Sequence, residues 1–284
     1  MNTIEILNSL FILPAIKSGI RERIWDNEID EKLKPIQKIW QDLELIDNNN
    51  KLTDKGYEVY DLIPLIDYYL SLKDDFFNFS IYDNYTASND QYNLLREGLQ
   101  VFHKHYNSNL FEYLDLTNKE WNVLDYGGGT GQYLIDFIKQ NPRSKGLLID
   151  RNIVDRDGFE NKIISKAIDF ENNLEWYEEY EEKFNLIVLS EVLHCKNKLM
   201  REYLIDTCWT MLKQNGLLLI NEIIPCPIFD WRMSMYTNGG RSISIEDIRE
   251  LTKDQWEEKR YVPDGCSSKI KYHYQVIYKV TNKE

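Results

Sequence analysis

Residues 122–134, with the sequence NVLDYGGGTGQYL, limit the possible folds of this chain more than any other stretch. A short apolar run ends at Asp125, glycines follow at positions 127, 128, 129 and 131, and apolar residues then recur at helical spacing. Glycine permits positive φ and lets the backbone approach a ligand closely. The start of the following helix presents free N–H groups. The pattern predicts a strand–turn–helix unit that binds a nucleotide.

The same turn distinguishes between classes of nucleotide. Counted from Gly127, the dinucleotide pattern G-x-G-x-x-G requires glycine where Gln132 stands. Asp125 would repel a pyrophosphate but suits a ligand that carries an ammonium group and no phosphate. S-adenosylmethionine is such a ligand, and D-x-G-x-G-T-G after a strand resembles the signature of class I S-adenosylmethionine-dependent methyltransferases. We expect Asp125, Gly127, Gly129 and Gly131 to bind this cofactor. A nicotinamide dehydrogenase is the alternative on the same fold, and Asp125 and Gln132 argue against it.

Length, charge and cysteine usage indicate an enzyme of the cytoplasm. A chain of 284 residues suggests one large or two modest domains. The net charge of −13 argues against a nucleic-acid partner. The four cysteines show neither C-x-x-C spacing nor any other metal-ligand pattern, so we expect reduced thiols and no metal site. No apolar stretch approaches the length of a membrane span.

Residues 1–118 are predicted to form a mostly α-helical domain of the winged-helix type. A helix over about 36–45 precedes an Asn-rich turn, a short strand and Thr53, which is placed to cap the next helix. This pattern also raises the possibility of a DNA-binding regulator. Residues 1–118 hold 11 basic and 20 acidic residues, a net charge of −9, whereas a DNA-binding surface needs a cationic stripe. We therefore expect a dimerisation and substrate-lid domain.

Residues 119–284 alternate strands and helices, as a doubly wound parallel α/β sheet requires. The closing strands are expected near 256–262 and 272–280, the last of them antiparallel. Asp150 ends the second strand 19 residues past Gly131, where a carboxylate can accept hydrogen bonds from both ribose hydroxyls. Asp169 and Phe170, at the end of the third strand, suit the exocyclic amine and the ring face of an adenine.

A histidine and a glutamate follow the next two predicted strands. His194 comes after the strand 184–189, and Glu222 ends the strand 217–221, which a turn at 213–216 precedes. Open α/β sheets bind ligands at the carboxyl ends of their strands. A carboxylate beside an imidazole holds one tautomer and raises its basicity. A lone histidine is more often a packed residue than a base, but the two side chains at neighbouring strand ends favour a catalytic pair.

The motifs taken together resemble the small-molecule O-methyltransferases of the caffeate and hydroxyindole type. The resemblance rests on VLDYGGGTG, GLLIDRNIV, the Asp169–Phe170 pair, SEVLHC, NGLLLINEIIP and DWRMSMYTNGGR, and it runs from the N-terminal module almost to the end of the chain. It implies that His194 deprotonates the acceptor hydroxyl, phenolic or enolic and from secondary metabolism, and that Glu222 orients His194. It also implies a homodimer. The resemblance also implies that Arg151 and Ser190 bind the cofactor. It implies that the acceptor pocket is lined by Trp231, Met233 and Tyr236.

The departures from that family concern the acceptor more than the cofactor. The family's second glutamate falls on Ser242, the residue after the histidine is Cys195 instead of Asp or Asn, and a lysine of plant members falls on Ser190. Transfer to oxygen is favoured, while transfer to carbon, nitrogen or sulfur stays open. A methyltransferase-like protein that has lost catalysis and acts as a binding partner is a further alternative.

Overall fold

The computed structural model describes residues 16–25, 33–61, 63–64, 67, 97, 100, 103, 110–151, 161–170, 172–223, 239–252, 256–260 and 275–281. Its contacts divide the chain into two compact units. One unit comprises Met1–Lys73 and Ser88–Phe102, and the other comprises Asp74–Ala87 and His103–Glu284. No described helix is both long and apolar enough to cross a membrane.

In the described part of the first unit, helix α2 (Lys34–Asp42) precedes a minimal β-element and helix α3 (Asp54–Asp61) follows it. Helix α2 buries Trp40, and an isolated antiparallel bridge joins Ile46 to Leu52. Helix α3 follows directly, and the Thr53 hydroxyl accepts a hydrogen bond from the Gly56 N–H at 3.1 Å, the capping role expected of it. The winged-helix assignment stays a prediction, because long segments of residues 1–118 lie outside the described residues.

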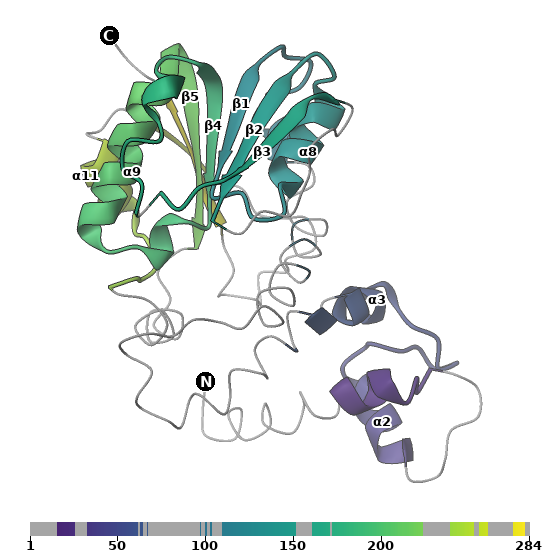
Figure 1. Ribbon diagram of the computed structural model, residues 1–284. Helices are drawn as coiled ribbons and strands as arrows, with labels where there is room; N and C mark the ends of the chain where they lie inside the picture. The colour runs from purple at the N-terminus through teal and green to yellow at the C-terminus, as the bar shows by residue number, and fades with distance from the viewer. Residues whose placement is uncertain are drawn as a thin grey trace. The chain divides into compact units, whose positions relative to one another are not determined.

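The second unit is built on a seven-stranded sheet in the order β3-β2-β1-β4-β5-β7-β6 (Figure 1). The strands are β1 (Asn122–Tyr126), β2 (Lys145–Asp150), β3 (Ile163–Ala167), β4 (Phe184–Ser190), β5 (Leu212–Ile223), β6 (Trp256–Arg260) and β7 (Gln275–Thr281). Strands β1 to β5 pair in parallel, which confirms the predicted Rossmann-like fold. Strand β7 pairs antiparallel with both β5 and β6.

Strand β5 differs from the prediction at its start. The turn expected at 213–216 lies inside the strand, where Asn215 has a φ of 60°. The pairing of β4 with β5 shifts register there, between Phe184 and Leu186 on β4. The turn residues thus form an irregularity of the strand, and the regular ladder begins at Leu217.

Helices cover both faces of the sheet (Figure 1). Helix α8 (Gln132–Gln140) covers one face, and α9 (Lys198–Met211) with α11 (Ile245–Thr252) covers the other. Because side chains alternate along a strand, each face has its own apolar core. The core on the α8 side also contains four residues that precede the domain boundary expected at 118/119 (Leu110, Phe111, Leu114, Leu116).

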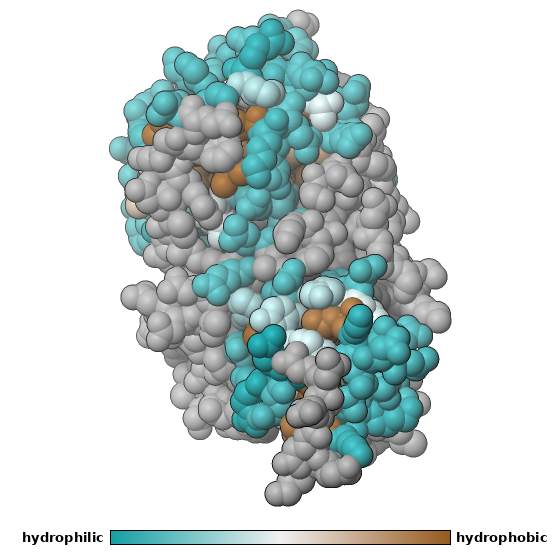
Figure 2. Space-filling model, turned by 90° about the vertical axis from the view of Figure 1, so that its right-hand side faces the viewer, coloured by the Kyte–Doolittle hydropathy of each residue, from teal (hydrophilic) through white to brown (hydrophobic). Residues whose placement is uncertain are grey.

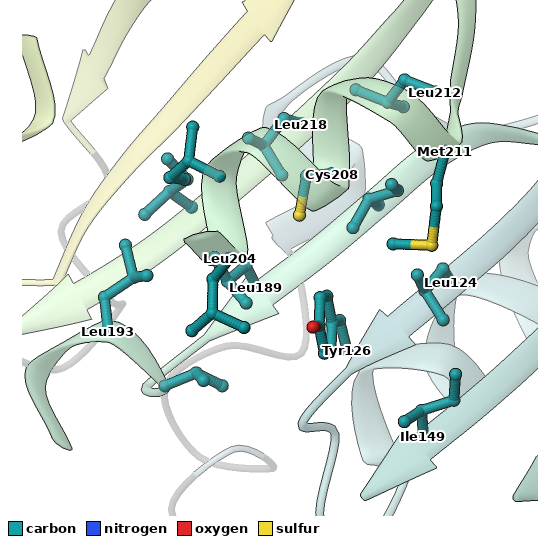
Figure 3. Close-up of a cluster of buried hydrophobic side chains, with 14 of the residues drawn as sticks. Leu124, Tyr126, Ile149, Leu189, Leu193, Leu204, Cys208, Met211, Leu212 and Leu218 are labelled. Carbon is teal, nitrogen blue, oxygen red and sulfur yellow. The ribbon is translucent and has the colours of Figure 1, made fainter. Parts of the chain in front are cut away.

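The core on the α9 side reaches the turn that carries His194. In Figure 3, Leu193 lies beside Leu204 and Leu189 at one end of this core, and Tyr126 and Ile149 lie further along it. Leu193 begins the 3-10 helix η5 (Leu193–Cys195) and is fully buried. Burying such a side chain contributes about 1.5–3 kcal/mol, so η5 is fixed to the core by its first residue.

The described surface is mainly polar on the face shown in Figure 2. Large apolar side chains that are exposed among the described residues stand far apart in the sequence, apart from one pair on α3 (Tyr57, Tyr60, Ile164, Leu174, Leu199). Single exposed apolar side chains are ordinary on folded domains.

Candidate active site

The glycine turn connects β1 to α8 and is held by backbone hydrogen bonds. The N–H of Gly127 donates to the Ile149 carbonyl at 2.7 Å, and the N–H of Gly131 donates to the Gly128 carbonyl at 2.8 Å. Gly127, Gly129 and Gly131 all have positive φ, which explains glycine at these positions. Gly131 is the N-cap of α8.

The turn is packed on one side and open on the other. A Cβ atom added to Gly127 would lie 2.7 Å from the Val192 side chain, and one added to Gly128 would lie 2.3 Å from Cγ of Asp125. A Cβ atom on Gly129 would meet nothing within 4 Å among the residues that the structure describes. The N–H of Gly129 donates to Oδ2 of Asp150 at 3.0 Å, which ties the open side of the turn to the end of β2. The open side is thus where a ligand can contact this backbone.

Asp125 is completely buried, and neither of its carboxylate oxygens has a hydrogen-bond partner in the described part of the chain. Burial raises the pKa of this carboxyl to about 7; the nearby Leu134 backbone N–H, which is not in hydrogen-bonding geometry, opposes the rise, and the charge of Asp150 adds to it. A buried carboxylate without a partner is costly. The site therefore favours a ligand that brings a cation or hydrogen-bond donors to Asp125.

A row of polar side chains continues from Asp125 along the strand ends on the α8 face. Ser190 on β4 and Asn221 on β5 lie two residues beyond apolar core positions of the same face and are paired with each other in register. Nδ2 of Asn221 donates to the Tyr133 hydroxyl at 2.6 Å and to Oγ of Ser190 at 2.9 Å. The sequence reasoning identified Ser190 but missed Tyr133 and Asn221. The change from apolar to polar at the end of β5 was the available signal for Asn221.

His194 and Glu222 meet on the opposite face of the sheet. Nδ1 of His194 lies 2.8 Å from Oε2 of Glu222, and the N–H of Leu193 donates to Oε1 of the same carboxylate at 2.7 Å. His194 is 7% exposed and Glu222 is 1% exposed. A carboxylate at Nδ1 makes that nitrogen the N–H donor, so Nε2 is the nitrogen that exchanges a proton. The sequence placed these two residues at neighbouring strand ends, and the structure brings them into contact.

The charges around His194 favour its protonated form. Burial by itself lowers the pKa of His194, but the neighbouring Cys195 and Glu222 outweigh burial and hold that pKa well above its ordinary value. Burial likewise raises the pKa of the Cys195 thiol, while His194 and Lys196 bring the net shift below the ordinary value. The imidazole therefore holds its proton strongly, and only its neutral form can act as a base.

The other predicted cofactor residues lie at the ends of β2 and β3. Arg151 is exposed just after Asp150. Oδ2 of Asp169 accepts a hydrogen bond from Nδ2 of Asn172 at 2.9 Å. Phe170 is buried against Tyr126 with ring centroids 5.0 Å apart, and the Lys196 ammonium lies 5.3 Å from its ring centroid. The predicted acceptor residues lie outside the described residues (Trp231, Met233, Tyr236).

Sequence reasoning also missed Arg201, which is 4% exposed. Arg201, Leu204, Ile205 and Cys208 recur at helical spacing, so a charge on the apolar stripe of α9 was the available signal. Nε of Arg201 donates to the Leu193 carbonyl at 2.9 Å. Within the described ranges, no three His, Cys, Asp or Glu side chains are grouped so that they could hold a metal ion.

A family model described as a methyltransferase domain matches residues 95–259, more than half of the chain. No curated protein sequence matches the chain.

Solved structures share the fold along the whole chain. An O-methyltransferase family protein from Burkholderia thailandensis has a TM-score of 0.72 and 12% identity, covering 99% of this chain and 98% of its own. CalO1, a methyltransferase of calicheamicin biosynthesis solved with S-adenosylhomocysteine, has a TM-score of 0.68 and 14% identity, with 99% of each chain covered. Human N-acetylserotonin methyltransferase, solved with S-adenosylmethionine, has a TM-score of 0.66 and 13% identity, covering 98% of this chain and 94% of its own. At such identities the likeness shows the fold.

Proposed function

This chain belongs to the methyltransferase-domain family, and from that premise we propose that it methylates a hydroxyl group of a small molecule, with S-adenosylmethionine as the methyl donor and His194 as the general base. The observation that carries the proposal is the buried His194–Glu222 pair, 2.8 Å apart at the carboxyl ends of β4 and β5. Ligands of open α/β sheets bind at these ends.

The residues around the glycine turn fit the cofactor. Asp125 offers two buried oxygens without a partner in the described part of the chain, which suits an α-ammonium group. Gly129 offers backbone beside open space, and Asp150 lies next to it at the end of β2, where ribose hydroxyls are expected. When bound, S-adenosylmethionine supplies a methyl group on a sulfonium centre that is ready for in-line displacement. The same groups fit a dinucleotide poorly, because Asp125 would repel a pyrophosphate.

The buried base favours oxygen as the acceptor atom. A phenolic hydroxyl has an ordinary pKa of about 10 and is a weak nucleophile until its proton is removed. In the proposed step the neutral His194 ring takes that proton at Nε2, Nδ1 donates to Glu222, and the carboxylate stabilises the imidazolium that forms. Such a base contributes a factor on the order of 10²–10⁴, and positioning of the reactants contributes the remainder. A thiol depends less on a base, because its ordinary pKa is about 8.5.

The acceptor side and the assembly belong to the same proposal. Trp231, Met233 and Tyr236 would line the pocket for a flat acceptor, and residues 1–118 would serve as lid and dimerisation domain. Both assignments rest on the resemblance to small-molecule O-methyltransferases.

Calorimetric titration with S-adenosylhomocysteine, with NAD as control, tests the cofactor class. We expect S-adenosylhomocysteine to bind with micromolar affinity and NAD not to bind. Binding of NAD alone would favour a dehydrogenase, and binding of neither would favour a protein that has lost catalysis.

Transfer of labelled methyl groups to a panel of phenols and enols then tests the reaction. His194→Asn is expected to lower turnover on the order of 10²-fold or more while it leaves the affinity for S-adenosylhomocysteine unchanged. Unchanged turnover in this variant would show that His194 is not the base.

A further inference from the structure

The peptide group just before His194 is held from both sides. Glu222 accepts the Leu193 N–H at 2.7 Å, and Arg201 donates from Nε to the Leu193 carbonyl at 2.9 Å. Both hydrogen bonds are buried, and both involve a charged side chain, the kind worth about twice a neutral bond. The Leu193 side chain is itself buried in the core (Figure 3). The orientation of η5, and with it the His194 ring, therefore depends on two side chains from β5 and α9.

Arg201 is an unusual group to find in this place. Its guanidinium donates to backbone carbonyls, that of Leu193 and, from Nη2 at 3.3 Å, that of Arg241. Burial lowers the pKa of Arg201, and the nearby cation of Arg241 adds to that, while the carboxylates of Asp247 and Glu222 act in the opposite direction. A buried cation costs free energy unless its donors are satisfied. The planar fork of arginine can satisfy two carbonyls at once, which an ammonium group does less well.

The second carbonyl belongs to the segment that leads into α11. A Cβ atom on Gly239 would lie 3.2 Å from Cβ of Asn197, the N-cap of α9, so this segment passes close to the start of α9. Arg241 is fixed by its ion pair with Asp247. The next residue, Ser242, is 1% exposed. Arg201 thus connects the turn that carries His194 to the segment that leads into α11.

We propose that Arg201 is a positioning residue for His194, which together with Glu222 fixes the Leu193 peptide. The inference deepens the proposed function and depends on it, because it assigns Arg201 a part in presenting the base. Arg201 acts through the backbone of η5 and touches no reacting atom.

The charge of Arg201 also acts on the proposed base. Glu222 on β5 and Cys195 on η5 favour the imidazolium, whereas the cation of Arg201 on α9 favours the neutral ring. Arg241 and Asp247 form an ion pair, so their charges largely cancel at His194. Loss of the Arg201 charge should therefore raise the pKa of His194 further.

The test observes His194 without any ligand. The chain has four histidines, so protein labelled with ¹³Cε1-histidine gives a simple spectrum, and His194→Asn identifies the His194 resonance. In Arg201→Met we expect this resonance to split or broaden and its titration midpoint to move to higher pH. Arg201→Lys keeps the charge, so its midpoint should return close to wild type, but the splitting should persist because an ammonium does not hold both carbonyls. Arg143→Met, which removes a guanidinium that is 73% exposed, is the control.

The titration of each variant with S-adenosylhomocysteine separates this inference from the proposed function. Wild-type protein that does not bind the nucleoside refutes the proposed function, whatever the His194 spectrum shows. We expect Arg201→Met to bind within about threefold of wild type, since the glycine turn is unaltered. Once an acceptor is known, kcat should fall on the order of 10²-fold with KM for the cofactor unchanged. A His194 resonance in Arg201→Met with the shape and midpoint of wild type and Arg143→Met overturns the inference. If Arg201→Met does not fold, an unsplit resonance in Arg201→Lys overturns it equally.

Discussion

Replacing Glu222 with glutamine removes the negative charge beside His194 and leaves the shape of the side chain nearly unchanged. The carboxylate accepts hydrogen bonds from the Leu193 N–H and from Nδ1 of His194, and it is 1% exposed. Glutamine offers one acceptor oxygen, so it can satisfy one of these two donors. A hydrogen bond to a charged group contributes about 1.5–3 kcal/mol, so we expect the variant to lose about 2–3 kcal/mol of unfolding free energy where His194 is protonated.

The loss depends on pH in a direction that the structure determines. The pKa of folded His194 lies well above the ordinary value of 6.5 that applies when the chain is unfolded. The stabilisation from the charged pair is therefore fully present below about 6.5 and declines as the pH rises through the folded pKa. The difference between wild type and Glu222→Gln should be largest near pH 6 and should shrink steadily toward pH 10.

Urea unfolding at several pH values, followed by tryptophan fluorescence and circular dichroism, measures this difference. Groups that titrate elsewhere in the chain are the same in both proteins, so their contributions to the difference in unfolding free energy cancel. The thiol of Cys195 titrates with His194, so the comparison is repeated in a Cys195→Ser background. A difference that stays constant from pH 6 to pH 10, or grows toward the alkaline end, would refute the charged pair.

Three further predictions concern the cofactor site. Because burial raises the pKa of Asp125 to about 7, binding of S-adenosylhomocysteine should ionise this carboxyl and release about one proton at pH 6 but little at pH 8.5. Calorimetry in buffers of different ionisation enthalpy measures the proton release. No release at pH 6, or a release that persists in Asp125→Asn, contradicts the role of Asp125 in binding the ligand. Asp150→Ala should weaken the binding of S-adenosylhomocysteine about 10- to 100-fold, whereas Asp206→Ala, on the exposed side of α9, should leave it unchanged. If a titration gives both variants the same affinity, Asp150 does not belong to the binding site. Gly129→Ala should cost only about 1 kcal/mol of stability yet block most binding of S-adenosylhomocysteine. Gly128→Ala, whose methyl group would overlap Asp125, should mainly destabilise the fold. Thermal melts and binding titrations of both variants separate the two effects.

Several features of the fold and the site were predictable because strand ends have a sequence signature. Apolar runs that stop at Asp125, Asp150 and Glu222 mark the carboxyl ends of β1, β2 and β5, and parallel strands bring those ends to one edge. The contact between His194 and Glu222 follows from that topology. The acceptor residues remain predictions, since 224–238 lie outside the described residues.

Contacts that depend on side-chain reach between distant elements were not predictable in the same way. Tyr133 and Asn221 are 88 residues apart, and no local pattern pairs them. Arg201 was visible as a charge on an apolar helix stripe, but its partners are backbone carbonyls, which every residue carries. The shifted start of β5 was also missed, because Asn215 and Gly216 form a turn or a strand irregularity with equal ease.

The position of β7 in the sheet has a consequence for the order in which the protein folds during synthesis. Strand β7 lies between β5 and β6, although the ribosome makes it after both of them. Until β7 emerges, the strand that carries Asn221 and Glu222 presents an open edge to other chains, which is a hazard for nascent proteins. Insertion of β7 closes that edge and pairs Glu222 with Val276. A ribosome that stalls before β7 should therefore hold a chain with most of its sheet assembled and a strong tendency to aggregate.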